Sequence, residues 1–145
     1  MKITMKFILS SLMFAVFALF LIGSGESDTS DEDKKKINDA PGIPVTAANL
    51  KKALKANEIK FMDTYKGKVL KVSGSVEGVD TGLTEDDVIV KISAGGTFDY
   101  VRCAMQKSQK SAASNLTKGD RITIKGKCTG ESIGNPQISG GLIVK

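Results

Sequence analysis

Two stretches in which apolar and polar residues alternate constrain the fold of this chain more than any other feature. Every second residue is apolar or glycine in residues 68–76 (KVLKVSGSV) and again in residues 121–128 (RITIKGKC). Successive side chains of a β-strand point to opposite faces, so this period predicts strands that are buried on one side. Gly74 lies inside the first stretch, and a glycine there is typical of a bulge or sharp bend. The chain is therefore expected to be mostly β.

Three more segments favour strands, namely residues 88–92, 98–105 and 137–144. Residues 106–116 favour a short helix or loop between the third and fourth strands. An N-terminal helix is expected to begin at Thr46, whose hydroxyl can accept hydrogen bonds from free backbone amides, and to end near Asn57. Its apolar residues recur with a helical period, which directs the remaining side chains to solvent. The expected solvent-facing cations on this helix are Lys51, Lys52 and Lys55.

Five short strands, with a helix between the third and fourth, follow the order of the OB-fold, a five-stranded Greek-key barrel. A glycine in the middle of the first strand agrees with that fold, because the first strand must coil around both halves of the barrel. We therefore predict an OB-fold domain over residues 41–145, with an N-terminal helix in front of the barrel.

The first 25 residues have the composition of an export signal. Residues 1–6 carry two lysines, residues 7–22 contain no charge, and Gly23 and Gly25 provide the small residues that precede a cleavage site. The alternative is an uncleaved N-terminal membrane anchor, although 16 helical residues span only about 24 Å of a hydrocarbon core of about 30 Å. Either outcome predicts a protein that is periplasmic, secreted or anchored to the cytoplasmic membrane. Membrane contact is expected only through residues 7–22, if they are retained.

Charge is distributed unevenly along the rest of the chain. Residues 26–40 carry six acidic and three basic side chains, and Ile37 is their only large apolar residue. Such a segment buries too little apolar surface to become ordered, so we expect a disordered acidic linker. Residues 41–145 hold 16 of the 21 basic and 10 of the 16 acidic side chains, so the predicted barrel is basic.

The absence of histidine excludes several kinds of site. Without it, the chain cannot form a Ser-His-Asp triad, a Cys-His pair or an imidazole zinc site. Its two cysteines are too few for an all-cysteine zinc site. We therefore expect neither catalysis nor a metal or other cofactor.

The order of several short motifs resembles the tRNA-anticodon-binding-like OB-fold family, whose members are exported or membrane-anchored bacterial proteins. The resemblance covers roughly residues 43–145 and implies the OB-fold, but no activity. It is carried by the motifs VTA (45–47) with Leu50, NE (57–58), YKGKVL (65–70), VSG (72–74), VRC (101–103), Leu116 with GD (119–120), ITI (122–124) and GKCTG (126–130).

Cys103 and Cys128 lie on the expected inward faces of their strands. Two cysteines in an exported domain most economically form one disulfide, which would close a loop of about 25 residues. Members of the family often carry a further cysteine near the C-terminus, but this chain has none there. The competing interpretation is a pair of buried thiols that pack as small apolar side chains.

The opposite face of the third strand carries the candidate ligand-binding residues. OB-fold proteins usually bind ligands on the outer face of their second and third strands, where aromatic rings stack and cations supply charge. Phe98, Tyr100 and Arg102 are expected on this face, with Lys71 and Lys91 at its border. The alternative is that Phe98 and Tyr100 only cover the barrel or the N-terminal helix.

These observations predict an exported, non-catalytic OB-fold binding module. Its basic domain favours an anionic partner, such as an oligosaccharide, an envelope component or an envelope protein. The alternative function is binding of single-stranded nucleic acid, which the aromatic and cationic face would also suit. Export disfavours that alternative, because cellular RNA and DNA are not normally found outside the cytoplasm.

Overall fold

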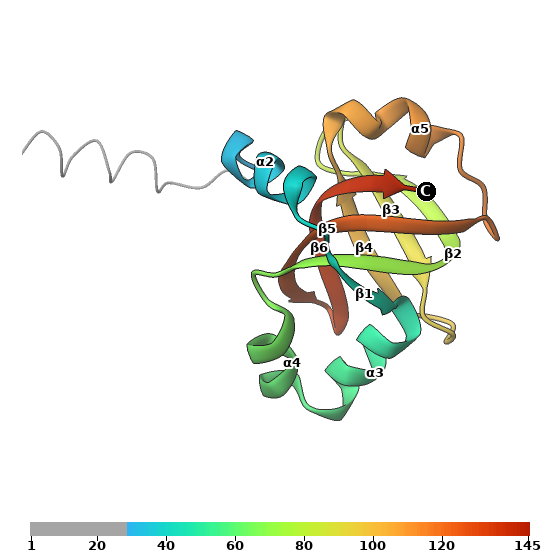
Figure 1. Ribbon diagram of the computed structural model, residues 1–145. Coiled ribbons are helices and arrows are strands. Elements are labelled where there is room, and N and C mark those ends of the chain that lie inside the picture. Colours follow the sequence, from blue (N-terminus) through green and yellow to red (C-terminus); the bar gives the residue numbers. More distant parts are fainter. Residues whose placement is uncertain (1–28) are drawn as a thin grey trace, which may run out of the picture.

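The computed structural model describes residues 29–145, so the predicted signal or anchor in residues 1–25 lies outside the described part (Figure 1). The five expected strands are present in the expected order, with a short helical segment between the third and fourth of them, which confirms the OB-fold. One further short strand, Ile43–Thr46, precedes these five and was not expected. The strands are β1 (Ile43–Thr46), β2 (Val69–Thr81), β3 (Val88–Ser93), β4 (Tyr100–Met105), β5 (Arg121–Ser132) and β6 (Asn135–Val144). The helices are α2 (Asp31–Asp39), α3 (Ala47–Ala56), α4 (Glu58–Tyr65), the short 3-10 helix Lys107–Gln109 and α5 (Lys110–Ser114).

The barrel closes because β2 pairs with two different strands along its length. Residues 69–75 pair with β5, and residues 76–81 pair with β3 after an irregularity between Val76 and Gly78. The order β2-β3-β4-β6-β5 then returns to β2, and β4 and β6 run parallel. Gly74 lies near the change of partner, where a Cβ atom would come within 2.5 Å of Ile92 Cγ2. Only glycine therefore lets β2 approach β3 this closely.

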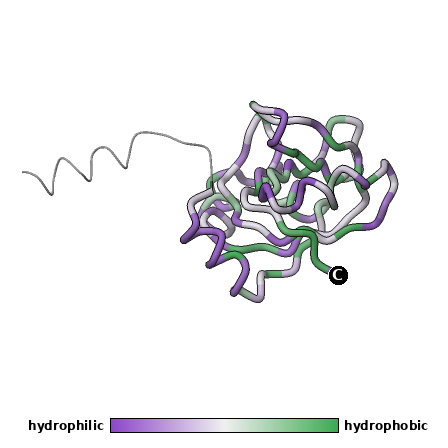
Figure 2. The backbone as a smooth tube through the Cα atoms, turned by 90° about the horizontal axis from the view of Figure 1, so that it is seen from above, coloured by the Kyte–Doolittle hydropathy of each residue, from purple (hydrophilic) through white to green (hydrophobic). Residues whose placement is uncertain are grey.

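A continuous apolar core fills the barrel and extends under α3 and α4. The inward positions of the strands alternate with half-exposed ones, as the sequence predicts, so each strand contributes every second side chain. Figure 2 shows this alternation of hydrophobic and hydrophilic residues along the chain, which ends in a hydrophobic stretch at the C-terminus. Fully buried members include Leu50, Phe61, Leu70, Val72, Val76, Val90, Ile92, Val101, Ile124 and Ile138.

The expected disordered linker over residues 26–40 is wrong for its described C-terminal part, which forms helix α2. Ser30 caps this helix, because its Oγ accepts a hydrogen bond from Asp33 N at 3.2 Å. Ile37 is fully buried in a notch at Gly140, where a Cβ atom would lie 2.5 Å from Ile37 Cδ1. Lys125 Nζ donates to the carbonyl oxygens of Asn38 and Ala40, each at 2.9 Å. The burial of Ile37 and the hydrogen bonds from Lys125 therefore hold this acidic segment on the barrel.

Strand β1 and helix α3 form one continuous entry into the barrel. β1 runs parallel to the first half of β2, with Thr46 opposite Ser73. The predicted helix start is confirmed, since Thr46 Oγ1 accepts a hydrogen bond from Asn49 N at 3.1 Å. Asn57 ends α3 and also caps α4, a helix that the sequence pattern did not predict.

Lys51 on α3 is buried rather than solvent-facing, so that expectation is wrong for this lysine. Only 6% of its surface is exposed, and its Nζ donates to the carbonyl oxygen of Gly134 and to Asn135 Oδ1. The same ammonium group lies 3.3 Å from Asp99 Oδ1, and Lys55 Nζ lies 2.6 Å from Asp99 Oδ2. These five residues join the β3–β4 loop and the β5–β6 hairpin to α3.

Candidate functional site

Three of the five predicted binding residues lie together on the outer face of β3 and β4. Tyr100 and Arg102 are half-exposed, while the residues between and after them point into the core. Lys91 on β3 is directly opposite Arg102, and its Nζ lies 5.1 Å from the centre of the Tyr100 ring. This arrangement follows from the antiparallel register, which brings outward-facing residues of neighbouring strands into one patch.

The other two predicted residues do not belong to this patch. Phe98 precedes β4 in the β3–β4 loop, and 82% of its surface is exposed. Lys71 lies on the first half of β2, opposite Pro44 on one side and Lys125 on the other. The part of β2 opposite Lys91 is Gly78, seven residues farther along a strand that rises about 3.3 Å per residue. Lys71 therefore belongs to another side of the barrel.

The two cations of the patch differ in their partners. Lys91 Nζ lies 2.5 Å from Asp80 Oδ2, and the hydrogen bond that Lys91 donates to this carboxylate raises the pKa of Lys91. Arg102 makes no hydrogen bond or ion pair through its side chain with any residue of 29–145. The guanidinium group of Arg102 is thus the cation of this patch that is available to a ligand.

Arg102 also lines a groove of about 640 Å³ that runs from the β2–β3 loop across β4, β6 and β5 to α2. Asp33 of α2 lies at its edge, where its Oδ1 is 3.1 Å from Lys127 Nζ. This hydrogen bond from Lys127 lowers the pKa of Asp33. The polar strand residues that line the groove are Arg102, Lys127, Thr129, Gln137 and Ser139.

The sequence interpretation missed Lys127, Thr129 and Gln137 as neighbours of Arg102. The alternation along residues 121–128 places Lys127 on the outer face, so this signal was present. Its proximity to β4 was hidden, because β6 lies between the two strands and follows both in sequence.

The predicted disulfide between Cys103 and Cys128 is wrong: both cysteines are free and fully buried. Each is opposite Ile138, Cys103 from the parallel strand β4 and Cys128 from the antiparallel strand β5. The two cysteines are therefore separated by two strand spacings of roughly 4.8 Å, whereas a disulfide requires Cα atoms within about 7 Å. The competing interpretation, buried thiols, matches the structure.

Burial also determines the chemistry of these thiols. Removal from water raises the pKa of Cys103 far above its usual range, and burial likewise raises the pKa of Cys128. A thiol must ionise to act as a nucleophile or metal ligand, so neither cysteine is suited to that role. Within residues 29–145, no group of three or more histidine, cysteine or acidic side chains is placed to hold a metal ion.

The comparison with protein families gives a match between residues 1–139 and the tRNA_anti-like family. This chain belongs to that family. Its structure is an OB-fold binding module of the tRNA_anti-like type, and no match is found among curated proteins.

Two similar solved structures differ in how closely they match, and the first supports the fold. One is a proposed nucleic acid-binding lipoprotein from Klebsiella pneumoniae subsp. pneumoniae MGH 78578, with 18% identity and a TM-score of 0.60 over 81% of this chain and 100% of that chain. Another is asparaginyl-tRNA synthetase from Pyrococcus horikoshii, with 12% identity and a TM-score of 0.44 over 55% of this chain and 20% of that chain. In residues 29–145, no helix has the length and apolar character needed to cross a membrane.

Proposed function

We propose that this OB-fold protein is a non-catalytic module that binds single-stranded nucleic acid along the outer face of β3 and β4. The observation that carries the proposal is the position of Arg102. Its guanidinium group has no partner within residues 29–145 and lies between the Tyr100–Lys91 pair and the groove. A cation beside a half-exposed aromatic ring can hold a phosphate while the ring stacks on a base.

Each residue of the patch has a distinct role in this proposal. Arg102 binds a backbone phosphate, and Tyr100 offers its ring to a base. Lys91 is already paired with Asp80, so it contributes mainly by orienting Tyr100. Lys127 becomes available if an incoming phosphate replaces the carboxylate of Asp33. The name of the Klebsiella protein, which also refers to nucleic acid, supports this choice of ligand.

A labelled single-stranded oligonucleotide tests the proposal by fluorescence anisotropy, with the full-length protein in mild detergent. Arg102→Gln should weaken binding at least about tenfold, because a charge-assisted hydrogen bond to phosphate is lost. Tyr100→Ala should remove about 1–3 kcal/mol of stacking free energy. Affinity should also fall steeply with salt, because bound phosphates release counterions.

Arg121→Gln is the matched control, because Arg121 lies at the start of β5 and does not line the groove. Unchanged affinity in both Arg102→Gln and Tyr100→Ala would contradict the proposal, and so would equal weakening by Arg121→Gln. Absence of any oligonucleotide binding by the wild-type protein would also exclude it.

An exported protein that binds an anionic envelope oligosaccharide, an envelope component or an envelope protein is the second candidate. The composition of residues 1–25 favours it, since the signal or anchor predicted there would place the barrel outside the cytoplasm. Fusion of residues 1–40 to a reporter that is active only after export tests this localisation. Export together with failure to bind oligonucleotides would favour the second candidate over the first.

A further inference from the structure

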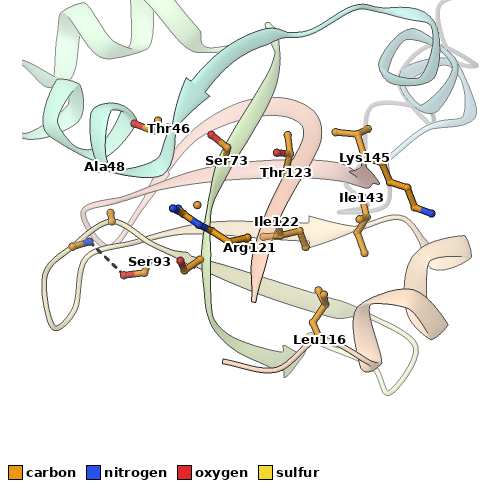
Figure 3. Close-up of a pocket in the computed structure, with 15 residues that line it drawn as sticks. Thr46, Ala48, Ser73, Ser93, Leu116, Arg121, Ile122, Thr123, Ile143 and Lys145 are labelled. Atoms are coloured by element: carbon orange, nitrogen blue, oxygen red, sulfur yellow. Dashed lines mark hydrogen bonds between the residues drawn. The ribbon is translucent and has the colours of Figure 1, made fainter. Parts of the chain in front are cut away.

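A second hollow lies away from the β3–β4 face, on the outer side of β1, β2 and β5 (Figure 3). Its volume is about 850 Å³, and its wall continues over the end of β3 and the C-terminal end of β6. It shares no lining residue with the groove beside Arg102. We call it the hydroxyl hollow, after the side chains of Thr46, Ser73, Ser75 and Thr123, which line it together with Arg121.

Strand register places the hydroxyl groups of this hollow in a row. Thr46 of β1 is opposite Ser73 of β2, which is in turn opposite Thr123 of β5. In the next row of the sheet, Ser75 is opposite Arg121. Figure 3 shows Thr46, Ser73 and Thr123 side by side, with the Arg121 side chain extending beneath them. Neighbouring strands are about 4.8 Å apart, so the three hydroxyls span roughly 10 Å.

These side chains retain unused hydrogen-bonding capacity. Thr46 Oγ1 accepts from Asn49 N, which fixes the oxygen and leaves its own O–H free to donate. The side chains of Ser73, Ser75 and Thr123 make no hydrogen bond within residues 29–145. Arg121 is exposed and has no ion pair within the same residues. A ligand would therefore find several donors that need not break an existing bond.

Charge and apolar surface narrow the class of ligand. Arg121 and Lys145 are the cations that line the hydroxyl hollow, and no aspartate or glutamate side chain lines it, whereas Asp33 and Asp87 line the groove beside Arg102. Arg121 can form paired hydrogen bonds with a phosphate or carboxylate group. The wall also contains the apolar residues Ala48, Leu116, Ile122 and Ile143. A ligand with hydroxyls, apolar C–H surface and one oxyanion group matches all three kinds of lining.

We propose that the hydroxyl hollow binds a saccharide that carries a phosphate or carboxylate group. Arg121 holds the oxyanion, and the row of Thr46, Ser73 and Thr123 binds the sugar hydroxyls. This site is separate from the one proposed for nucleic acid, since it shares no lining residue with the groove and contains neither Tyr100 nor Arg102.

Isothermal titration of the full-length protein in detergent tests this site with four probes: glucose 6-phosphate, glucuronate, glucose and inorganic phosphate. Binding of glucose 6-phosphate or glucuronate at least about tenfold tighter than both glucose and phosphate is expected, and the stronger acid identifies the preferred oxyanion. Equal binding of phosphate and glucose 6-phosphate would overturn the saccharide assignment. Failure of both acidic sugars to bind would overturn the site.

Two variants on β5 locate the binding, and one on β4 is the control. Arg121→Gln should weaken acidic-sugar binding at least about tenfold, and Thr123→Val should weaken it a few-fold while keeping a β-branched residue in the strand. Arg102→Gln should leave it unchanged. Unchanged binding in Arg121→Gln, or equal loss in Arg102→Gln, would overturn the assignment to this hollow. Oligonucleotide binding should instead be weakened by Arg102→Gln and unchanged by Arg121→Gln. Either proposal can therefore fail without the other.

Discussion

The cations of this barrel fall into two regions that use charge in different ways. Under α3, Lys51 is buried and has three partners, and Lys55 shares one of them. On the two outer faces, Arg102 and Arg121 have no side-chain partner within residues 29–145. A positive charge that already joins loops to a helix is committed to structure, whereas an unpaired guanidinium is available to a ligand. The number of basic residues alone does not distinguish these roles.

Lys51→Met tests the structural side of this comparison and should have the largest effect. The substitution removes the ammonium donor from the Gly134 carbonyl and leaves Asn135 Oδ1 with only the longer hydrogen bond from Tyr100 N, at 3.3 Å. An unsatisfied buried polar group costs about 1–3 kcal/mol, so the free energy of unfolding should fall by a similar amount in urea denaturation. Lys52→Met, an exposed neighbour, should change it by less than about 0.5 kcal/mol. Equal effects would show that Lys51 is not structural.

Ile133→Asn should instead stabilise the protein by about 1 kcal/mol, since it relieves strain at the tip of the hairpin that Lys51 holds. Ile133 has φ of 51° and Gly134 of 72°, a pair of positive angles that two-residue hairpin turns usually fill with Asn-Gly. The Ile133 side chain is 95% exposed, so little packing is lost. Urea denaturation measures the change, with Ile59→Asn on α4 as the exposed control. A decrease in stability would contradict this account of the turn.

Acid should weaken the same region through Asp99. Hydrogen bonds from Lys55 and then Lys51 lower the pKa of Asp99 below its ordinary value of 3.8. The charged carboxylate therefore stabilises the folded state fully above about pH 4, and this contribution is lost as pH falls toward the lower folded-state pKa. In Asp99→Asn, the melting temperature should fall less between pH 4 and lower pH than it does in the wild type. Asp39→Asn, at an exposed position of α2, should leave this dependence unchanged. An unchanged pH profile in Asp99→Asn would contradict the prediction.

Arg102→Gln and Arg121→Gln should change the free energy of unfolding by less than about 0.5 kcal/mol, because neither side chain holds another element in place. Thermal unfolding without ligand measures this directly. If either variant lowers the free energy of unfolding by more than about 1 kcal/mol, that arginine has a structural role and is not available to a ligand.

Reducing agent should have no effect at all on thermal unfolding, because both cysteines are free. Titration of the denatured, unreduced protein should find two thiols. A lower melting temperature in dithiothreitol, or fewer than two thiols, would contradict the separation of Cys103 and Cys128 by β6.

The strands could be predicted from sequence because their signal is local. Alternation along residues 68–76 and 121–128 reports burial within each strand, and the order of elements then indicates the barrel. The sequence could not predict that α2 is an ordered helix, because Ile37 is buried against Gly140, about a hundred residues later. Lys51 was misassigned for the same reason, since its partners in the hairpin lie 83 and 84 residues away.

The candidate site divides in the same way. Alternation placed Tyr100, Arg102 and Lys91 on outward faces, and strand pairing brings them together. The sequence places Lys71 at the border of this patch because the pattern does not show which half of β2 pairs with β3. In fact, its two halves pair with different neighbours and face different sides of the barrel. The hydroxyl hollow could not be predicted from the sequence. Isolated serines and threonines on three strands do not indicate a shared site until the register of those strands is known.

Closure of the barrel also affects how copies of this protein meet in a concentrated solution. Strands β2 to β6 have neighbours on both sides along at least part of their length, so among the strands of residues 29–145 only β1 has one edge free along its whole length. That edge is four residues long and contains Pro44, which has no backbone N–H to offer a neighbouring chain. Short edges interrupted by proline are poor templates for strand addition. The strand with a fully free edge is therefore protected against edge-to-edge polymerisation by its shortness and by Pro44.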